Sequence, residues 1–356
     1  MDKNLPKYVI VESKIREAIE RKRIVDKLPG ERVLAEEFGF SYMTIRKAIN
    51  NLVDQGVLYR VATKGTFVGD SSPARTRTGN IAYLLDGRIR EGLRSPYYSL
   101  VFNELEKVVA NQGYSLLYFS NPEEILSQKT LGKVDGIIVS CFPRIEPLIQ
   151  QAKSLVPIVL IDNSADDLSI PSVTIDNFNA VYDAIDHLCS FGHQRIGFIT
   201  GLDDSNIGRH RLSGYKNALD DHQLKPESSL VFEGDYTFES GQRGAKALLS
   251  LRNPPTAIMC ANDTMALGAM RELNRRGMSI PDDISVVGFD DIAVSSQLVP
   301  ALTTVSAPIT KIAENSVKML LDQIEGREPD MMHIALRGKL AIRQSSGAVI
   351  KKAEIA

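Results

Sequence analysis

The sequence predicts an α/β protein in which two Rossmann-like lobes follow a small N-terminal α+β domain. Beyond residue 80, short β-rich runs alternate with amphipathic helical segments, a pattern typical of parallel sheets covered on both faces. The first 69 residues have a different order, with helices followed by two short strands. Between them, residues 70–79 are polar, without apolar periodicity, and typical of a linker. We therefore predict domains at 1–69 and 80–346, and a C-terminal tail at 347–356.

Composition and charge agree with this division. The chain has 356 residues, 43% of them hydrophobic and 24% charged, which is too long for one ordinary globular domain. Residues 1–79 carry 15 Lys and Arg against 10 Asp and Glu, whereas the remainder carries 27 against 34. A basic domain at the head of an acidic body suits a partner rich in phosphates, such as DNA.

Targeting and metal signals are weak. The N-terminus lacks the apolar core of a signal peptide, and no apolar run approaches the roughly 20 residues of a membrane span. We expect a cytoplasmic protein without a membrane partner. Cys141, Cys189 and Cys260 lie far apart in apolar runs, as reduced core residues do, and the five histidines show no metal-ligand spacing with them. Neither a metal nor a cofactor is expected.

In the N-terminal domain, the sequence predicts three helices and a β-hairpin. A helix at 8–23 precedes a second one, which opens at the turn Leu28–Arg32 and ends at Gly39. Ser41 can cap a third helix. The buried stripe of that helix recurs at 3.6-residue spacing and comprises Ile45, Ala48, Ile49, Leu52 and Val53. Its free N-terminal end carries Tyr42, Met43, Thr44, Arg46 and Lys47. Strands at 57–60 and 66–68 are joined by a tip that contains Lys64.

This domain resembles the winged helix-turn-helix of GntR-type bacterial repressors. The resemblance rests on Pro29-x-Glu31-Arg32, on Ser41-x-x-Thr44-x-Arg46 and on Lys64-Gly65-Thr66-Phe67-Val68. It implies that the DNA-contacting positions are Arg32, Ser41, Thr44, Arg46, Lys64 and Gly65, and Tyr42, Met43 and Lys47 join them at the free helix end. Tyr42 stands where the family often has Arg, and Ala62 where it commonly has Gly, so the base preference is expected to be atypical. The alternative, that Arg32 and Arg46 are solvated helix charges, is disfavoured because six positions agree at once.

In residues 80–346, called the body below, the sequence predicts nine strands and seven helices. The strands are expected at 81–85, 115–119, 136–139, 158–161, 173–175, 196–199, 230–232, 257–260 and 285–289. The helices are expected at 100–111, 147–155, 180–191, 211–220, 239–251, 265–276 and 310–325. Ligands of such folds bind in loops at the carboxyl ends of parallel strands.

Several of those loops carry groups that suit a sugar. Asp162, the pair Asn262-Asp263 and the pair Asp290-Asp291 follow predicted strands, and carboxylate or amide oxygens can accept hydrogen bonds from vicinal hydroxyls. Arg211 can donate to hydroxyl oxygens, and the ring of Tyr236 offers a flat apolar face. Each signal is weak by itself, because such Asn and Asp pairs are more often helix caps or turns.

Together these motifs resemble the LacI/GalR effector domain, itself akin to periplasmic sugar-binding proteins. The matching segments are Ser95-Pro96-Tyr97-Tyr98, Val134-Asp135-Gly136-Ile137-Ile138, Phe191-Gly192-His193-Gln194-Arg195-Ile196, Arg211-Leu212-Ser213-Gly214-Tyr215, residues 261–268, residues 280–291 and Leu302-Thr303-Thr304-Val305. The resemblance implies effector contacts by Asp162, Arg211, Tyr236, Asn262 and Asp290, with Tyr98 lining the pocket from the other lobe. Gly288 and His193 are expected to serve the fold.

The two resemblances together predict a homodimeric, sugar-responsive transcription regulator, expected to be a repressor that binds an inverted-repeat DNA operator. Residues 70–79 do not resemble the hinge helix of LacI-type repressors. The layout resembles arabinose-responsive repressors, which makes a pentose the first choice of effector. Alternatives are a solute-binding protein, which the basic head and absent signal segment disfavour, and a regulator whose co-repressor is a nucleobase or sugar phosphate. A sugar-processing enzyme is also disfavoured, because no phosphate loop, nucleophile elbow or metal cluster is found.

Overall fold

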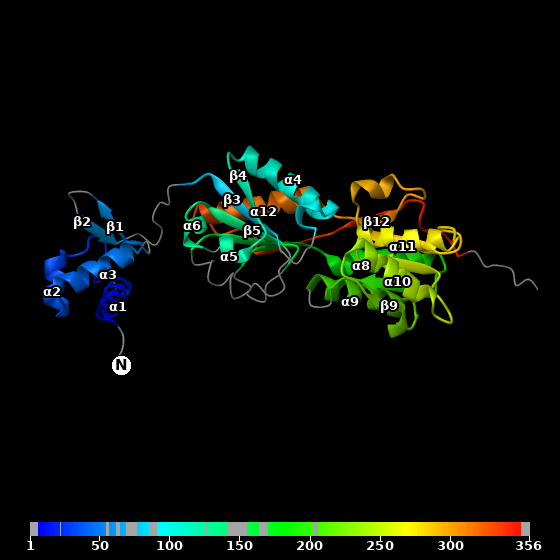
Figure 1. Ribbon diagram of the computed structural model, residues 1–356, viewed down its shortest axis with the longest axis horizontal. Coiled ribbons are helices and arrows are strands. Elements are labelled where there is room, and N and C mark those ends of the chain that lie inside the picture. Colours follow the sequence, from blue (N-terminus) through cyan, green and yellow to red (C-terminus); the bar gives the residue numbers. More distant parts are fainter. Residues whose placement is uncertain are drawn as a thin grey trace, which may run out of the picture. The chain divides into compact units, whose positions relative to one another are not determined.

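The computed structural model divides the chain into two compact units, Met1–Arg77 and Thr78–Ala356 (Figure 1). It describes residues 6–21, 23–54, 57–61, 65–68, 77–85, 91–125, 127–140, 155–163, 170–202 and 206–349. The division falls in the segment predicted to be a linker, of which residues 70–76 lie outside the described residues. At the start of the second unit, the buried carboxylate of Asp135 accepts hydrogen bonds from Thr78 N and Gly79 N, each at 2.9 Å.

The first unit is a three-helix domain with a hairpin. Its elements are α1 (Lys7–Glu20), α2 (Glu31–Phe38), α3 (Tyr42–Asp54), β1 (Leu58–Val61) and β2 (Gly65–Val68). As predicted, Gly39 ends α2 in the left-handed conformation, with φ 72°. The strands pair antiparallel with Tyr59 opposite Phe67. Val11, Ile15, Leu34, Ile45 and Leu52 are among the fully buried residues of its core, so the apolar stripe of α3 faces inward as its spacing predicts.

The second unit contains two six-stranded sheets in its described residues. The first lobe has the strand order β13-β7-β6-β5-β3-β4, and the second has β14-β12-β11-β10-β8-β9. The strands of the first lobe are β3 (Asn80–Leu85), β4 (Ser115–Phe119), β5 (Gly136–Ser140), β6 (Ile158–Ile161), β7 (Ser172–Ile175) and β13 (His333–Leu336). Those of the second are β8 (Ile196–Thr200), β9 (Val231–Glu233), β10 (Ala257–Cys260), β11 (Ser285–Asp290), β12 (Thr303–Ser306) and β14 (Lys339–Ala341). All described pairings are parallel except that of β12 with β14.

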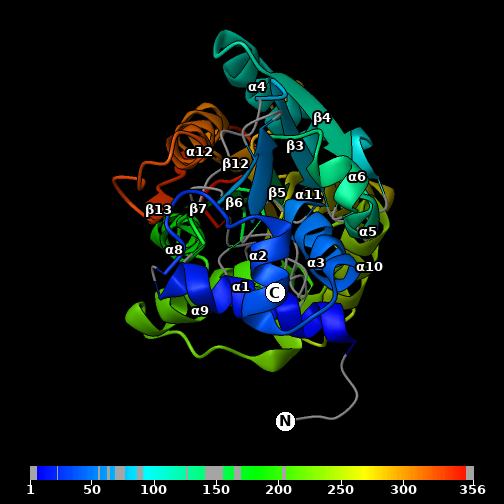
Figure 2. The same ribbon diagram turned by 90° about the vertical axis from the view of Figure 1, so that its left-hand side faces the viewer.

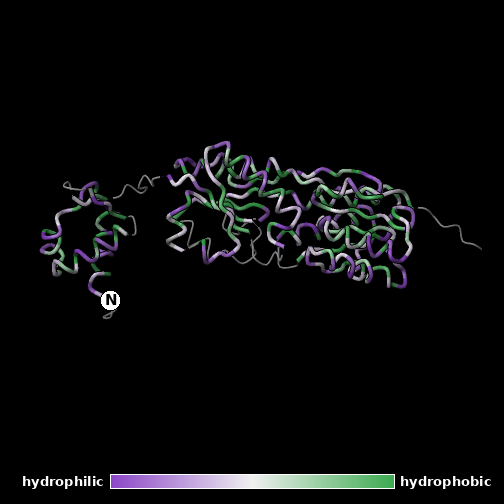
Figure 3. The backbone as a smooth tube through the Cα atoms, turned by 45° about the horizontal axis from the view of Figure 1, so that its top comes forward, coloured by the Kyte–Doolittle hydropathy of each residue, from purple (hydrophilic) through white to green (hydrophobic). Residues whose placement is uncertain are grey.

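Helices cover both sheets, and hydrophobic stretches run through the interior of each lobe (Figure 3). The first lobe has η1 (Gly92–Arg94), α4 (Pro96–Asn111), α5 (Pro122–Ile125), α6 (Gln128–Leu131) and α12 (Ile309–Ile324). The second has α8 (Asn177–Ser190), α9 (Asn206–Asp221), η2 (Ser228–Leu230), α10 (Phe238–Leu249), α11 (Asp263–Arg275) and η3 (Ala293–Ser296). No helix among the described residues is long and apolar enough to cross a membrane.

The described chain passes between the lobes three times. It leaves the first lobe after β7, returns after β12 to form α12 and β13, and leaves again before β14. α12 packs against α4, β5 and β6, and β13 lies beside β7 (Figure 2). The second crossing places a C-terminal helix and strand on the lobe that is built first along the chain.

The nine predicted body strands are confirmed with ends that shift by at most two residues, and six of the seven predicted helices are confirmed. The helix predicted at 147–155 falls almost wholly on residues outside the described ranges. β13 and β14 were not predicted, because they are four and three residues long and only partly buried. The sequence motif Leu302-Thr303-Thr304-Val305 covers most of β12. Edge strands as short as β13 and β14 leave no hydrophobic alternation to detect.

Glycines let the helices of the second lobe touch at their backbones. A Cβ on Gly268 of α11 would lie 2.0 Å from Phe238 O of α10, and one on Gly241 of α10 would lie 2.0 Å from Met265 O. On α9, a Cβ on Gly214 would lie 2.3 Å from Phe178 O of α8. Backbone atoms cannot yield as a flexible side chain can, so these helix pairs admit no side chain at the contact.

Gly268→Ala should therefore lower the free energy of unfolding by roughly 2 kcal/mol or more, because overpacking here moves one helix off another. Gly277→Ala, at the end of the same helix, is the control. No atom lies within 4 Å of a Cβ there, but φ is 72°, so it should cost only about 1 kcal/mol. Urea denaturation of both variants measures the difference, and equal losses would contradict the packing account.

Candidate DNA-binding and effector-binding sites

The N-terminal end of α3 is exposed and capped. Ser41 Oγ accepts a hydrogen bond from Thr44 N at 3.3 Å and lies 2.8 Å from Thr44 Oγ1, so Ser41 is the cap that the sequence predicts. Tyr42 is 41% exposed and Met43 69% exposed, an unusual exposure for large apolar side chains. Such side chains can contact base edges and thymine methyl groups in a major groove.

The other predicted DNA contacts are also at the surface of the head. Arg32 and Arg46 are exposed on α2 and α3, and Gly65 is exposed at the start of β2. The ammonium of Lys47 lies 4.1 Å from the centre of the Tyr8 ring, which holds this side chain toward α1. Gly65 has φ 118°, and a Cβ there would lie 3.0 Å from Cε of Lys27, so a side chain would be strained at this position. Lys64 lies outside the described residues.

In the body, the first lobe contributes a buried carboxylate held by a tyrosine. Asp162 follows β6 with φ 54° and is 4% exposed. The hydroxyl of Tyr97, on α4, donates to both of its carboxylate oxygens, at 2.9 and 2.8 Å. Burial raises the pKa of Asp162 to about 6, although the Tyr97 hydrogen bond and the charge of Arg211 both lower it.

The tyrosine at this carboxylate is Tyr97, whereas the sequence favoured its neighbour Tyr98. Tyr98 packs edge-on against Tyr97, with ring centres 5.1 Å apart. Burial raises the pKa of the Tyr97 hydroxyl well above its ordinary value, and the negative charge of Asp162 adds to this effect. Tyr97 therefore stays protonated and acts as a donor.

The second lobe contributes an arginine that three elements hold in place. Arg211 of α9 is 6% exposed. Its Nε donates to Asn177 Oδ1 of α8 at 2.8 Å, and its Nη1 donates to Ala261 O after β10. The guanidinium carbon lies 3.6 Å from the centre of the Phe289 ring on β11, a cation–π contact. Asn177 and Phe289 were not singled out from the sequence, because an amide at a helix start and an apolar strand residue give no functional signal by themselves.

Asp290, the last residue of β11, is buried without a donor. It is 7% exposed and has φ 115°, and no group among the described residues donates a hydrogen bond to its carboxylate. Burial raises its pKa well above the ordinary range; the charge of Arg211 lowers it, and the charges of Asp263 and Asp162 raise it further. Charged groups of the two lobes therefore shift each other's pKa: Asp290 and Arg211 belong to the second lobe, and Asp162 and Tyr97 belong to the first.

Asn262 and Tyr236, which are also predicted to contact the effector, make contacts within the protein. Asn262 caps α11, accepting from Met265 N at 2.9 Å, and its Nδ2 donates to Tyr236 O at 3.1 Å. Tyr236 has φ 65°, and its ring lies on Gly201, where a Cβ would be 1.9 Å from it. Asn262 thereby ties Tyr236 to the helix start, which is the helix-cap role that the sequence also allowed.

The acidic neighbours of the site are structural. Asp263 is fully buried and accepts from Thr304 Oγ1, Ser295 Oγ and Ile292 N at 2.5, 2.7 and 2.9 Å. A Cβ on Gly288 would lie 2.1 Å from its carboxylate, so Gly288 serves the fold as expected. Asp291 pairs with Arg343 at 2.6 Å. His193 is buried between Thr256 Oγ1, at 2.8 Å from Nδ1, and Ser285 Oγ, at 3.1 Å from Nε2.

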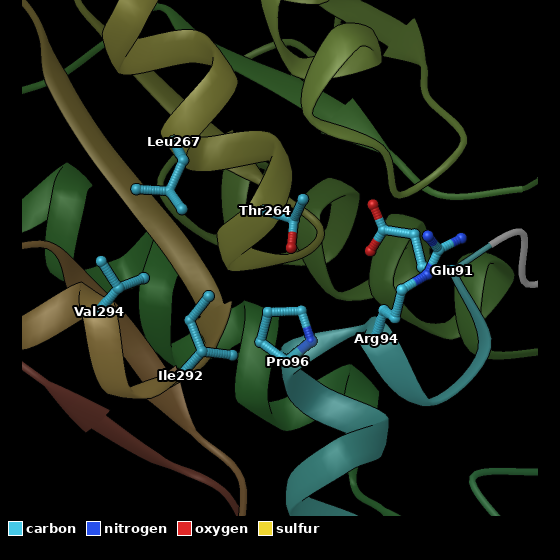
Figure 4. Close-up of a pocket in the computed structure, with 7 residues that line it drawn as sticks. All are labelled: Glu91, Arg94, Pro96, Thr264, Leu267, Ile292 and Val294. Atoms are coloured by element: carbon cyan, nitrogen blue, oxygen red, sulfur yellow. The ribbon is translucent and has the colours of Figure 1, made fainter.

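The body also has a cavity of about 420 Å³, a size that suits a small organic ligand (Figure 4). Glu91, Arg94 and Pro96 line it from η1 and α4, and Thr264, Leu267, Ile292 and Val294 line it from α11 and the segment after β11. Asp162, Tyr97, Arg211 and Asp290 are not among its lining residues, but along the chain Pro96 precedes Tyr97 and Ile292 lies two residues after Asp290. Both lobes therefore contribute to one cavity.

Among the described residues, no group of three His, Cys, Asp or Glu side chains could hold a metal ion.

Comparison with known proteins settles the family. The model of the bacterial regulatory proteins of the gntR family matches residues 7–68, and that of the periplasmic binding protein-like domain matches residues 185–346. The HTH-type transcriptional repressor CytR of Escherichia coli K12 is 33% identical over 262 residues, which cover 71% of this chain and 76% of CytR. The chain belongs to the LacI family of transcriptional repressors. It departs from that family's usual layout in carrying a GntR-type head.

Other LacI-family proteins agree. The repressor PurR of Escherichia coli O1:K1 is 31% identical over 268 residues, covering 73% of this chain and 79% of PurR. The crystal structure of a LacI-family regulatory protein from Chloroflexus aggregans is 31% identical, with a TM-score of 0.66, and covers 76% of this chain and 99% of its own. Both sequence resemblances are thus confirmed, and the relatives are repressors rather than enzymes.

The raised pKa of Asp162 predicts how stability depends on pH. A carboxyl whose folded-state pKa is raised stabilises the fold in its protonated form, and this stability is lost as pH rises from about 4 through about 6. A shift of that size corresponds to about 3 kcal/mol. Asp162→Asn keeps an acceptor for Tyr97 and removes the charge. The variant should match the wild type near pH 4 and unfold at a higher temperature than it above pH 6.

Asp291→Asn is the matched control, because it removes a carboxylate that also follows a strand, β11, but that has an ion-pair partner in Arg343. It should lower the unfolding temperature at pH 7, opposite in sign to Asp162→Asn. Differential scanning calorimetry between pH 4 and 8 measures both. If the difference in unfolding temperature between the wild type and Asp162→Asn did not change with pH, burial would not be what raises the pKa of this carboxyl.

Proposed function

We propose that this LacI-family repressor binds a small polyhydroxylated effector, a sugar, between the two lobes of its body, and that the effector changes the affinity of the GntR-type head for a DNA operator. The observation that carries the proposal is the carboxylate of Asp290, which is 7% exposed and accepts no hydrogen bond from the described residues. Buried carboxylates without donors are costly, and a ligand that donates to this one would remove that cost.

The chemistry around Asp290 favours hydroxyl groups. Arg211 offers a fixed cation whose charge acts on Asp290. Asp162 and the hydroxyl oxygen of Tyr97 offer acceptors from the opposite lobe, since the Tyr97 proton is donated to Asp162. A sugar presents several hydroxyls that both donate and accept, so it can satisfy carboxylates and a guanidinium at once. A pentose remains the first choice among sugars, on the resemblance to arabinose-responsive repressors.

The fold supports a closing motion as the signal. A ligand held by Asp162 on one lobe and Asp290 on the other would draw the two lobes together. The three chain crossings are short. Asp176 N at the first crossing donates to Leu336 O at the third, at 2.8 Å, and Arg337 of the third pairs with Asp183 of α8 at 2.8 Å. These contacts keep the crossings together while the lobes turn about them.

The proposed assembly is a homodimer on an inverted-repeat operator. Two bodies that pair place two heads on one duplex, and closure of the lobes changes how well the heads match two half-sites. The effector can act only through its different affinities for the two arrangements.

Reciprocal substitutions in the head and the body test the proposal. Arg46→Ala should weaken binding to a duplex selected by the wild-type chain by about 1 to 3 kcal/mol, because a base contact is lost, and leave effector affinity unchanged. Asp290→Ala should abolish effector binding and leave the duplex bound. Fluorescence anisotropy with labelled duplex and calorimetric titration with the effector measure the two affinities.

Asp291→Ala is the control in the body, since it removes the carboxylate next to Asp290 that is already paired with Arg343. It should bind both partners as the wild type does. If Arg46→Ala lost effector affinity, or Asp290→Ala still responded to the effector, the assignment of the two sites would be wrong.

A further inference from the structure

Arg60, on the first strand of the hairpin, joins three elements of the head. Its Nη2 donates to Asn50 Oδ1 of α3 at 2.8 Å and to Glu31 Oε1, at the start of α2, at 3.3 Å. The Arg60 side chain is 44% exposed and that of Glu31 is 23% exposed. One nitrogen thus bridges the helix pair and the hairpin at the surface of the domain.

Other described contacts of the hairpin are apolar, cation–π or backbone contacts. Leu58 and Val68 are buried in the core of the head, where apolar packing sets distance more than direction. Leu28 N donates to Thr66 O at 2.8 Å and Val68 N donates to Asp26 O at 2.7 Å, so β2 is bonded to the segment before α2. The bond from Arg60 to Asn50 is directional and ends on α3 itself.

The angle between α3 and the hairpin matters for DNA binding because both contact one rigid duplex. A helix end in the major groove and a hairpin tip on the backbone must fit at the same time, and a misplacement of about 1 Å weakens such a combined fit. A side chain that fixes this angle contributes to specific binding without contacting DNA.

We propose that Arg60 is a positioning residue for operator recognition, which acts through Asn50 and Glu31 to hold the hairpin in register with α3. The inference rests on the proposed function of the head as the operator-binding domain. The role is distinct from that of Arg46, which faces outward from α3. Because exposed ion pairs add little to stability, the head should fold without this contact.

The test uses the full chain and the duplex that the wild-type chain selects from a random-sequence library. Arg60→Ala should weaken binding to this duplex about 10-fold, the effect of losing one charge-assisted hydrogen bond. Its affinity for a random-sequence duplex should stay within about 2-fold of wild type, and the salt dependence measured between about 50 and 200 mM should keep its slope. The Asn50→Ala and Arg60→Ala losses should not add in the double variant.

Arg21→Ala is the matched control, because it removes an equal charge from an exposed pair of the same head, with Glu17 at 2.7 Å. It should leave specific binding unchanged. A salt slope that falls by about 1 in Arg60→Ala would make Arg60 a phosphate contact and overturn the proposal, and so would additive losses in the double variant. If the wild-type chain enriches no sequence, the proposed function fails, and this inference fails with it.

Discussion

Three buried carboxylates and one buried guanidinium form the charge arrangement on which the body depends. The charge of Arg211 lowers the pKa of Asp162 and Asp290, and burial raises the pKa of Asp162, Asp263 and Asp290. Asp263 offsets this cost with three hydrogen bonds, and Asp162 with the hydroxyl of Tyr97. Asp290 has no such compensation among the described residues. Burial therefore raises the pKa of the Asp290 carboxyl without a hydrogen bond from the described residues to offset it.

Backbone conformation places these groups at the cost of local strain. Asp162, Tyr236, Asp290 and Asp291 all have positive φ, and each lies at the end of a strand or within three residues after one. Non-glycine residues adopt this conformation rarely, and they do so chiefly where the surrounding structure holds them for a functional purpose. These residues stand at the carboxyl ends of parallel strands, which is the edge of a sheet where ligands of such folds bind. After β10, the side chain of Asn262 caps α11 and the carbonyl of Ala261 accepts from Arg211.

Much of the fold could be predicted from the sequence because its signals are local. The apolar stripe of α3, the cap at Ser41 and the left-handed Gly39 each depend on a few neighbouring residues. Partners set by tertiary packing could not be predicted. Tyr97 and Tyr98 are adjacent on one helix, about 100° apart around its axis, and only the packing of α4 decides which hydroxyl reaches Asp162. The return of α12 to the first lobe leaves no local trace, since any amphipathic helix can cover either sheet.

Side-chain roles divide in the same way. The position of Asn262 after a strand allows both a ligand contact and a helix cap. In the structure its oxygen caps α11 and its amide donates to Tyr236 O, and the sequence cannot choose between the two roles. Arg60 gave no signal, because its partners lie 10 and 29 residues away along the chain.

The central claim is that effector binding in the body changes DNA binding by the head, and its most direct measurement is operator affinity with and without effector. A panel of mono- and disaccharides, nucleobases and sugar phosphates, screened for a rise in unfolding temperature, supplies the compound. The account predicts that a sugar raises this temperature and, at saturation, changes affinity for the selected duplex about 5- to 150-fold, which is a coupling of about 1 to 3 kcal/mol. A sugar that stabilises the protein and leaves operator affinity unchanged would contradict the account.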